Sequence, residues 1–250
     1  MGTTPTDLTV DQSAGTIYVA NYGSNSVTII DAATLATSTL PLAGNPFSVA
    51  VDSATHTAYV GTRANSTAVI RGGAILSTAP GGYAVAFNEV NGMAYSIAET
   101  AATVYAIEGA NVTAIAVGQV PHKLAINQTT GTVYVANFNS KSITAIDGTT
   151  VSSTIGLSSA PYAIAADSGG TAVYVSLRGQ ARLAVIEGTT VVASTLVGIQ
   201  PDAVTVDNST GTAYVTTEAR GTLATVIKTT LEQRPFIVSF RPWDGKADAA

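Results

Sequence analysis

The hydrophobic positions of the chain fall into short apolar runs of about five to seven residues, separated by Gly, Asn, Asp and Pro. No stretch shows the Glu/Lys/Leu periodicity of a surface helix. The same local context recurs around six tyrosines, which are Tyr18, Tyr59, Tyr95, Tyr134, Tyr174 and Tyr214. Their spacing of 36 to 41 residues is an internal repeat, which determines how the rest of the sequence is interpreted.

Each repeat unit holds four such runs. An apolar run ending in Asp or Asn precedes each Tyr, as in DLTVD (7–11), and a further run follows it, as in SVTIID (26–31). A Thr/Ser/Val-rich run closes the unit, and Pro or Gly82 stands just before the first run. Four antiparallel strands repeated about every 40 residues are typical of a β-propeller blade. We therefore predict an all-β protein, a six-bladed β-propeller of four-stranded antiparallel blades.

The six units fill nearly the whole chain and predict a single propeller domain over residues 1–240. The predicted blades span residues 5–42, 46–80, 82–120, 121–160, 161–200 and 201–240, and residues 241–250 form a C-terminal tail. The run PFIVSF (235–240) is expected to be the outermost strand of the last blade, with Trp243 covering the seam. Both chain ends then fall near a blade boundary, so we expect the ring to close by side-chain packing.

The composition agrees with strands that are buried on both faces. Charged residues make up 11% of the 250 residues, against roughly 25% in an average soluble domain. The net charge of −5 and the few Lys and Arg argue against nucleic acid as a partner. Because the chain has no Cys, disulfides, thiolate zinc sites and Cys nucleophiles are excluded.

We expect no membrane span and no signal peptide within the sequence. The uncharged stretch 32–51 is long enough to cross a bilayer, but Pro41, Pro46 and its alternating Ser and Thr argue against a spanning helix. The N-terminal Met-Gly-Thr-Thr-Pro has neither a basic region nor an apolar core. The localisation stays undetermined, although the absence of Cys is compatible with a secreted or periplasmic protein.

The recurring pattern P-x-x-(L/V/I)-A-(V/I)-(D/N), followed by T-G-T-x-Y-V-A-N and N-S-(V/I)-T-x-I-D, resembles the YVTN repeat, which is related to NHL-type propellers. The resemblance covers roughly residues 5–230 and is best at TIYVANYGSNSVTIID and TVYVANFNSKSITAID. The third unit departs most, with AYSIAET in place of YVAN. The resemblance implies a propeller fold. It also implies a family whose members are often secreted or surface-layer proteins of prokaryotes, among propellers that include lyases and other small-molecule enzymes.

Two rings of side chains follow from the repeat. Because the Tyr strand returns to the end of the blade where the Pro lies, the loop after it and the residue after the Pro should share one face of the disk. The first ring takes the fourth residue after each repeat Tyr, namely Tyr22, Arg63, Glu99, Phe138, Arg178 and Glu218. The second ring takes the residue after each Pro or after Gly82, namely Thr6, Phe47, Tyr83, His122, Tyr162 and Asp202. The first ring reads aromatic, Arg, Glu twice, which suggests a three-blade unit duplicated once.

This gathering of charged and aromatic residues predicts a pocket at the mouth of the central channel. The residues expected to bind a substrate are Arg63 and Arg178 for anionic groups, Tyr22, Phe47, Tyr83, Phe138 and Tyr162 as walls, and Asp202. The residues expected to move protons are His122, Glu99 and Glu218. The alternative is structural, because Arg63 neighbours Glu99 by blade order and Arg178 neighbours Glu218. Those pairs would then be inert salt bridges between blades.

The two histidines are separated by the repeat. His56 aligns with Gly15, Gly131 and Gly211 in the first hairpin turn, so we expect a left-handed backbone on the opposite face of the disk. His122 lies in the second ring and is the best general acid/base candidate. With one His on each face, a two-His metal site is excluded.

We predict a small-molecule-binding propeller, an enzyme of lyase or cyclase type that uses acid/base side chains. The alternatives are a non-catalytic secreted or surface-layer interaction module and a binding protein that uses the same pocket without turnover. No cofactor is expected, although a divalent cation held by Glu99, Glu218 or Asp202 is left open. The expected partner is a small-molecule ligand, with no nucleic acid and no membrane, and the chain is expected to be a monomer.

Overall fold

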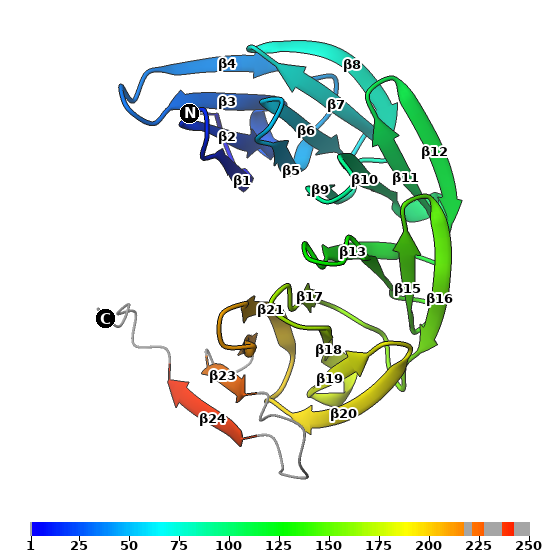
Figure 1. Ribbon diagram of the computed structural model, residues 1–250. Helices are drawn as coiled ribbons and strands as arrows, with labels where there is room; N and C mark the ends of the chain where they lie inside the picture. Colours follow the sequence, from blue (N-terminus) through cyan, green and yellow to red (C-terminus); the bar gives the residue numbers. More distant parts are fainter. Residues whose placement is uncertain (1, 218–221, 228–236, 243–250) are drawn as a thin grey trace.

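The computed structural model describes residues 2–217, 222–227 and 237–242, with side chains up to residue 217. Within these residues the chain forms six four-stranded antiparallel sheets, arranged around a central axis (Figure 1). The predicted all-β blade architecture and the number of blades agree with these sheets. The ring of sheets stays open on one side, between the first sheet and the sixth (Figure 1).

The first three blades follow one another along the chain. Blade one consists of β1 (Pro5–Asp11), β2 (Thr16–Asn21), β3 (Ser26–Asp31) and β4 (Thr37–Pro41), with the 3₁₀ turn η1 (Tyr22–Ser24). Blade two consists of β5 (Pro46–Asp52), β6 (Thr57–Thr62), β7 (Ser66–Arg71) and β8 (Ala74–Pro80). Blade three consists of β9 (Val85–Asn88), β10 (Met93–Ala98), β11 (Thr103–Glu108) and β12 (Asn111–Ala116), with η2 (Glu99–Ala101).

The other three blades repeat this order. Blade four consists of β13 (Pro121–Ile126), β14 (Val133–Asn137), β15 (Ser142–Asp147) and β16 (Thr150–Gly156). Blade five consists of β17 (Ile164–Ala166), β18 (Ala172–Leu177), β19 (Arg182–Glu187) and β20 (Thr190–Leu196), with η3 (Arg178–Gln180). Blade six consists of β21 (Pro201–Asp207), β22 (Thr212–Thr217), β23 (Thr222–Ile227) and β24 (Ile237–Pro242). The predicted last strand is thus confirmed, two residues further along than expected, while Trp243 lies outside the described residues.

The first strand of each blade lines the axis and packs beside the first strand of the next blade, from β1 to β21 (Figure 1). The second strands are buried on both faces, as in β6, whose six residues are all buried. The fourth strands lie at the rim and are largely exposed. This placement explains the low charge of the chain, because two strands in each blade have little access to water.

The hairpin turns at the far end of the blades are fixed by side-chain caps. The carboxylate of Asp11 accepts hydrogen bonds from the backbone N–H groups of Ser13 and Ala14, at 3.1 Å each. His56 occupies the predicted left-handed position in the equivalent turn, with φ of 56°. Its Nδ1 lies 2.8 Å from the Asp11 carboxylate, which joins blade two to blade one. The prediction for His56 is therefore confirmed.

The apolar core lies between blades rather than inside them. Tyr18 packs with Val49 and Val60 of blade two, and Tyr95 packs with Val133 and Val135 of blade four. The repeat Tyr of one blade thus covers aliphatic side chains of the next. In some blades the Tyr hydroxyl also donates a hydrogen bond across the interface. Tyr95 Oη, for example, donates to the Gly148 carbonyl oxygen at 2.8 Å.

Among the described residues, the expected closure of the ring by side-chain packing is not observed. Leu8 of β1, on the side that faces the opening, is 61% exposed, and Val10 is 41% exposed.

None of the helices in the described ranges is long and apolar enough to cross a membrane.

Candidate functional site

The two predicted rings meet at one end of the blades. Pro46 pairs with Thr62 and Pro121 pairs with Asn137, so each first strand begins beside the end of its second strand. The residue after the Pro and the loop after the second strand therefore share one face, as predicted. This face is called the mouth below.

In four of the six blades, a β-bulge re-aims the second-ring side chain at the mouth. The strand register shifts between Pro5 and Asp7, Pro46 and Ser48, Pro121 and Lys123, and Pro201 and Ala203. The residue that each shift leaves without a partner is the second-ring residue, such as Phe47 or His122. Because a bulge re-aims the extra side chain, the repeat places these residues outside the regular in-and-out alternation. The sequence predicted their positions, but not the bulge that orients them.

The first group at the mouth, here called the Arg63 cluster, contains Phe47, Arg63 and Tyr83. The Arg63 guanidinium carbon lies 4.5 Å from the ring centre of Phe47 and 4.7 Å from that of Tyr83. The two rings are themselves 5.4 Å apart. Each such cation–π contact contributes about 0.5–1 kcal/mol at an exposed site. Arg63 itself is exposed, and none of the described carboxylates lies within ion-pair distance of it.

The second group, here called the Arg178 cluster, contains His122, Phe138, Tyr162, Arg178 and Asp202. The Arg178 guanidinium carbon lies 4.5 Å from the Tyr162 ring centre, and its Nη1 lies 3.9 Å from the Asp202 carboxylate. His122 stands edge-on to Phe138, with ring centres 5.6 Å apart. The same motif of an arginine over a second-ring aromatic residue thus occurs twice at the mouth.

His122 is held as part of the wall. Its side chain is 8% exposed and its Nε2 lies 2.8 Å from the Tyr162 carbonyl oxygen of the next blade. Burial lowers the pKa of His122, and the positive charge of Lys123 lowers it further, although the bond to the Tyr162 carbonyl opposes this. With Nε2 as the donor, Nδ1 is the proton acceptor, and it is buried without a hydrogen-bond partner. In this conformation a ligand in the mouth has no direct access to Nδ1.

The Tyr83 hydroxyl connects the two clusters electrostatically. Burial raises its pKa, and the charge of Glu99 raises it further, while Arg63 lowers it and Tyr162 raises it. Groups from blades two, three and five therefore act on one phenol. The mouth brings together most of the side chains that were predicted to meet there.

Asp7 joins blade one to blade two, because its Oδ2 accepts a hydrogen bond from the backbone N–H of Val49 at 2.8 Å. Burial raises the pKa of Asp7, although hydrogen bonds from the backbone of Val49 and Leu8 and the charge of Lys123 oppose it. Neither Asp7 nor Lys123 was among the predicted site residues, although both stand two positions after a Pro.

The remaining predicted residues are placed as follows. Thr6 donates its hydroxyl to the Pro46 carbonyl at 3.2 Å and so joins blades one and two. Tyr22 begins η1 and Glu99 begins η2, both partly exposed. No ring contact joins Tyr22 to the other aromatic residues among the described side chains. Glu218 lies outside the described residues.

One of the two salt bridges of the structural alternative is not formed among the described residues, because Arg63 lies over aromatic rings rather than beside the Glu99 carboxylate. Arg178 pairs across a blade boundary with Asp202. Its expected pair with Glu218 falls outside the described residues and stays a prediction. The described residues contain no group of three or more His, Asp or Glu side chains that could hold a metal ion.

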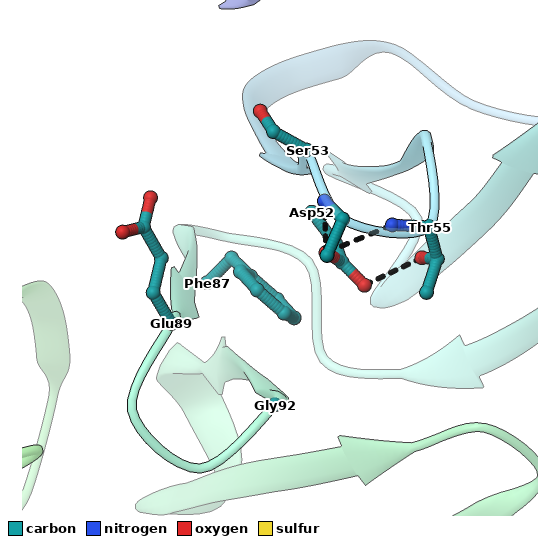
Figure 2. Close-up of a pocket in the computed structure, with 7 residues that line it drawn as sticks. Asp52, Ser53, Thr55, Phe87, Glu89 and Gly92 are labelled. Atoms are coloured by element: carbon teal, nitrogen blue, oxygen red, sulfur yellow. Dashed lines mark hydrogen bonds between the residues drawn. The ribbon is translucent and has the colours of Figure 1, made fainter. Parts of the chain in front are cut away.

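A hollow of about 490 Å³ lies at the opposite end of blades two and three (Figure 2). Its lining includes Asp52, Thr55, Phe87 and Glu89. The Asp52 carboxylate is engaged by its own turn, through the backbone N–H groups of Ala54 at 2.9 Å and Thr55 at 3.2 Å. Figure 2 shows the Glu89 side chain extending away from this turn. The hollow therefore offers a ligand little free polar chemistry and contains none of the predicted site residues.

Comparison with known proteins shows the fold. No protein-family model matches the sequence, and no curated protein matches it. Among solved structures, the WD40 β-propeller domain of Doa1 matches with a TM-score of 0.68 and 11% identity, over 90% of this chain and 79% of that chain. A functionally unknown protein from Desulfotomaculum acetoxidans DSM 771 matches with a TM-score of 0.67 and 14% identity, over 91% of this chain and 83% of that chain. These likenesses show a propeller in general, while the YVTN repeat family stays a prediction.

Proposed function

We propose that the mouth of the propeller binds a small, planar, anionic molecule. The observation that supports the proposal best is the repeated arginine-on-aromatic arrangement, Arg63 on Phe47 and Tyr83, and Arg178 on Tyr162. Arg63 is exposed, and a guanidinium can bind a carboxylate or phosphate through two parallel N–H groups.

The surroundings of these arginines suit a flat ligand. Phe138 is 38% exposed, and Phe47, Tyr83 and Tyr162 are partly exposed, so several ring faces reach solvent at the mouth. Rings held in place by packing offer apolar area at a small entropic cost, and charged edges then fix the orientation of the ligand. An aromatic carboxylate combines both properties and is the ligand class that we propose.

We further propose that the mouth catalyses a lyase or cyclase reaction. In this reaction Glu99 carries the proton, because it is partly exposed at the mouth and interacts with Tyr83. His122 acts as a positioning residue that holds Tyr162 and Phe138 in the wall, because its Nδ1 is buried. Asp202 orients Arg178. Glu218 keeps its proposed role on the basis of its repeat position alone.

A thermal-shift screen tests the binding proposal. Benzoate, phthalate and succinate are compared with benzamide, on the wild type, Arg63→Gln and Arg178→Gln. Arg71→Gln is the matched control, because Arg71 lies at the other end of blade two, where its Nε donates to Thr57. We expect the aromatic acids to raise the melting temperature of the wild type and the control. Each mouth variant should lose at least tenfold in affinity, which corresponds to about 1.4 kcal/mol.

Glu99→Gln separates binding from catalysis. If the mouth is an active site, this variant should keep the affinity for a substrate and lose turnover, because the amide cannot transfer the proton. Unchanged melting temperatures of the wild type with all of the acids would contradict the binding proposal and favour the non-catalytic interaction module.

A further inference from the structure

The two sides of the opening in the ring carry the residues that form the blade interfaces elsewhere. In blades two to six, the position of Leu8 is occupied by Val49, Val85, Leu124, Ile164 and Val204, all buried or partly buried. Leu8 itself is 61% exposed. Val10, two residues further along the same strand, is 41% exposed. The face of blade one toward the opening thus has the composition of an interface without a neighbour.

Blade six shows the complementary face. The repeat Tyr of blades one to five is at most 9% exposed in every case, whereas Tyr214 is partly exposed. Two positions after the Tyr, blades one to five carry a buried residue, such as Ala20 or Ala136, whereas Thr216 is exposed. In the other blades this face is covered by the following blade, and here that blade is absent from the described residues.

A hollow lies on the blade-one side of the opening. It measures about 360 Å³ and is lined by Pro5, Thr6, Asp7, Leu8 and Val19. At the other blade boundaries the equivalent aliphatic side chains pack with the Tyr ring of the preceding blade, as Val49 and Val60 do with Tyr18. The hollow therefore has the position of a missing aromatic side chain.

The solved propellers are longer than the part of this chain that matches them. About nine-tenths of this chain covers 79% and 83% of those two chains, which leaves about a fifth of each unmatched. A fifth of such a chain is at least the length of one repeat unit of this protein.

We propose that the opening is the docking site for one further four-stranded unit of the chain's own repeat type, which completes a seven-bladed ring. Its face toward blade six presents aliphatic residues on the first and second strands and covers Tyr214. Its face toward blade one presents an aromatic residue on the second strand and fills the hollow over Leu8 and Val10. The interface is continuous with the five blade interfaces already formed.

Maleimide labelling tests whether the opening exists, and the absence of Cys from the chain removes the background. Ile164, which occupies the position of Leu8 in blade five, is 9% exposed in a formed blade interface, so Ile164→Cys should react slowly. Leu8 is 61% exposed, so Leu8→Cys should react at least tenfold faster. Equal protection of Leu8→Cys and Ile164→Cys would show direct closure of a six-bladed ring and overturn the proposal.

A fusion tests the occupant. A second copy of residues 121–160 is joined to the C-terminal end of the full chain through a flexible linker. The labelling rate of Leu8→Cys by a maleimide should fall at least tenfold and the melting temperature should rise. A control fusion replaces the Tyr134 equivalent in the added copy by Asp and should protect less. Unchanged labelling of Leu8→Cys in the first fusion would contradict the proposal. Protection of Leu8→Cys in the unfused chain that grows with protein concentration would also contradict it, since the occupant would then be a second copy.

This inference does not depend on the ligand proposed for the mouth. Failure of the acids to bind leaves the labelling result unchanged, and direct closure of the ring leaves the Arg63 cluster in place.

Discussion

Replacing Tyr95 by Phe removes one hydroxyl from the interface between blades three and four. Tyr95 is fully buried, donates its hydroxyl to the Gly148 carbonyl at 2.8 Å and accepts a hydrogen bond from Asn91 Nδ2 at 2.8 Å. The ring and its apolar contacts are retained in the variant. The change therefore separates the two hydrogen bonds of the hydroxyl, of which the one to Gly148 joins the blades, from the burial of the aromatic ring.

The expected loss follows from the two partners. Gly148 is partly exposed, so water replaces part of the lost bond, and the cost should be about 1–1.5 kcal/mol. For a chain of this size that corresponds to a fall in melting temperature of about 3–5 °C. Tyr174→Phe should behave alike, because its hydroxyl donates to the Gly211 carbonyl of the next blade at 3.0 Å.

Tyr59→Phe is the matched control. Tyr59 is 5% exposed and stacks on Phe87 with ring centres 5.9 Å apart, but its hydroxyl makes no hydrogen bond within the described residues. Removing the Tyr59 hydroxyl should lower the free energy of unfolding by less than about 0.5 kcal/mol. Urea denaturation followed by circular dichroism gives both values from the midpoints, provided that the slopes agree. Equal losses for Tyr59→Phe and Tyr95→Phe would refute the assignment of the hydroxyl bond as the difference between these interfaces.

Three further changes test the fold. Burial opposes the ionisation of Asp11, but bonds from Ser13 and His56 lower its pKa to about 2 from the ordinary 3.8. Ionised Asp11 therefore stabilises the fold above about pH 4. In urea titrations at pH 6, Asp11→Asn should have a free energy of unfolding about 1–2 kcal/mol below that of the wild type, and this difference should vanish as the pH falls toward 2. Gly82→Ala should lower the urea midpoint strongly, because φ is 128° and an added Cβ would lie 2.4 Å from the Ser66 carbonyl oxygen. Gly109→Ala, with open space around it, should cost far less, and equal costs would contradict the clash.

The fold was predictable because the repeat carries it. One period of about 40 residues, repeated six times, gives the number of strands, their order and the end of the blade at which the Pro lies. The left-handed backbone of His56 followed from its alignment with Gly15 and Gly131, since equivalent turns require equivalent dihedral angles. These properties are local to a blade.

The site was predictable only in part, because its contacts join different blades. The repeat identified Phe47 and Arg63 as members of one face, but the contact of Arg63 with both Phe47 and Tyr83 depends on the angle between two sheets. The burial of His122 follows from the bulge after Pro121, which a pattern of residue types does not reveal. The first strands of blades three and five begin only at Val85 and Ile164, after Tyr83 and Tyr162, which the repeat does not reveal either.

The opening of the ring was not predictable for the same reason. Closure depends on the sum of the angles between all sheets, and each blade sequence specifies only its own pairing and the packing on its two faces. Leu8 and Tyr214 look like ordinary interface positions in the sequence. Their exposure becomes visible only when the blades are assembled.

The most direct measurement of the proposed function is a two-dimensional ¹⁵N–¹H NMR titration of the arginine Nε–H groups with benzoate. Binding at the mouth predicts saturable shifts of the Arg63 and Arg178 signals with one common dissociation constant. The signals of Arg71, at the other end of blade two, and of Arg182, which donates to the Ser194 carbonyl, should stay in place. Signals of Arg63 and Arg178 that stay in place, or that shift no more than those of Arg71 and Arg182, would contradict the proposed binding site.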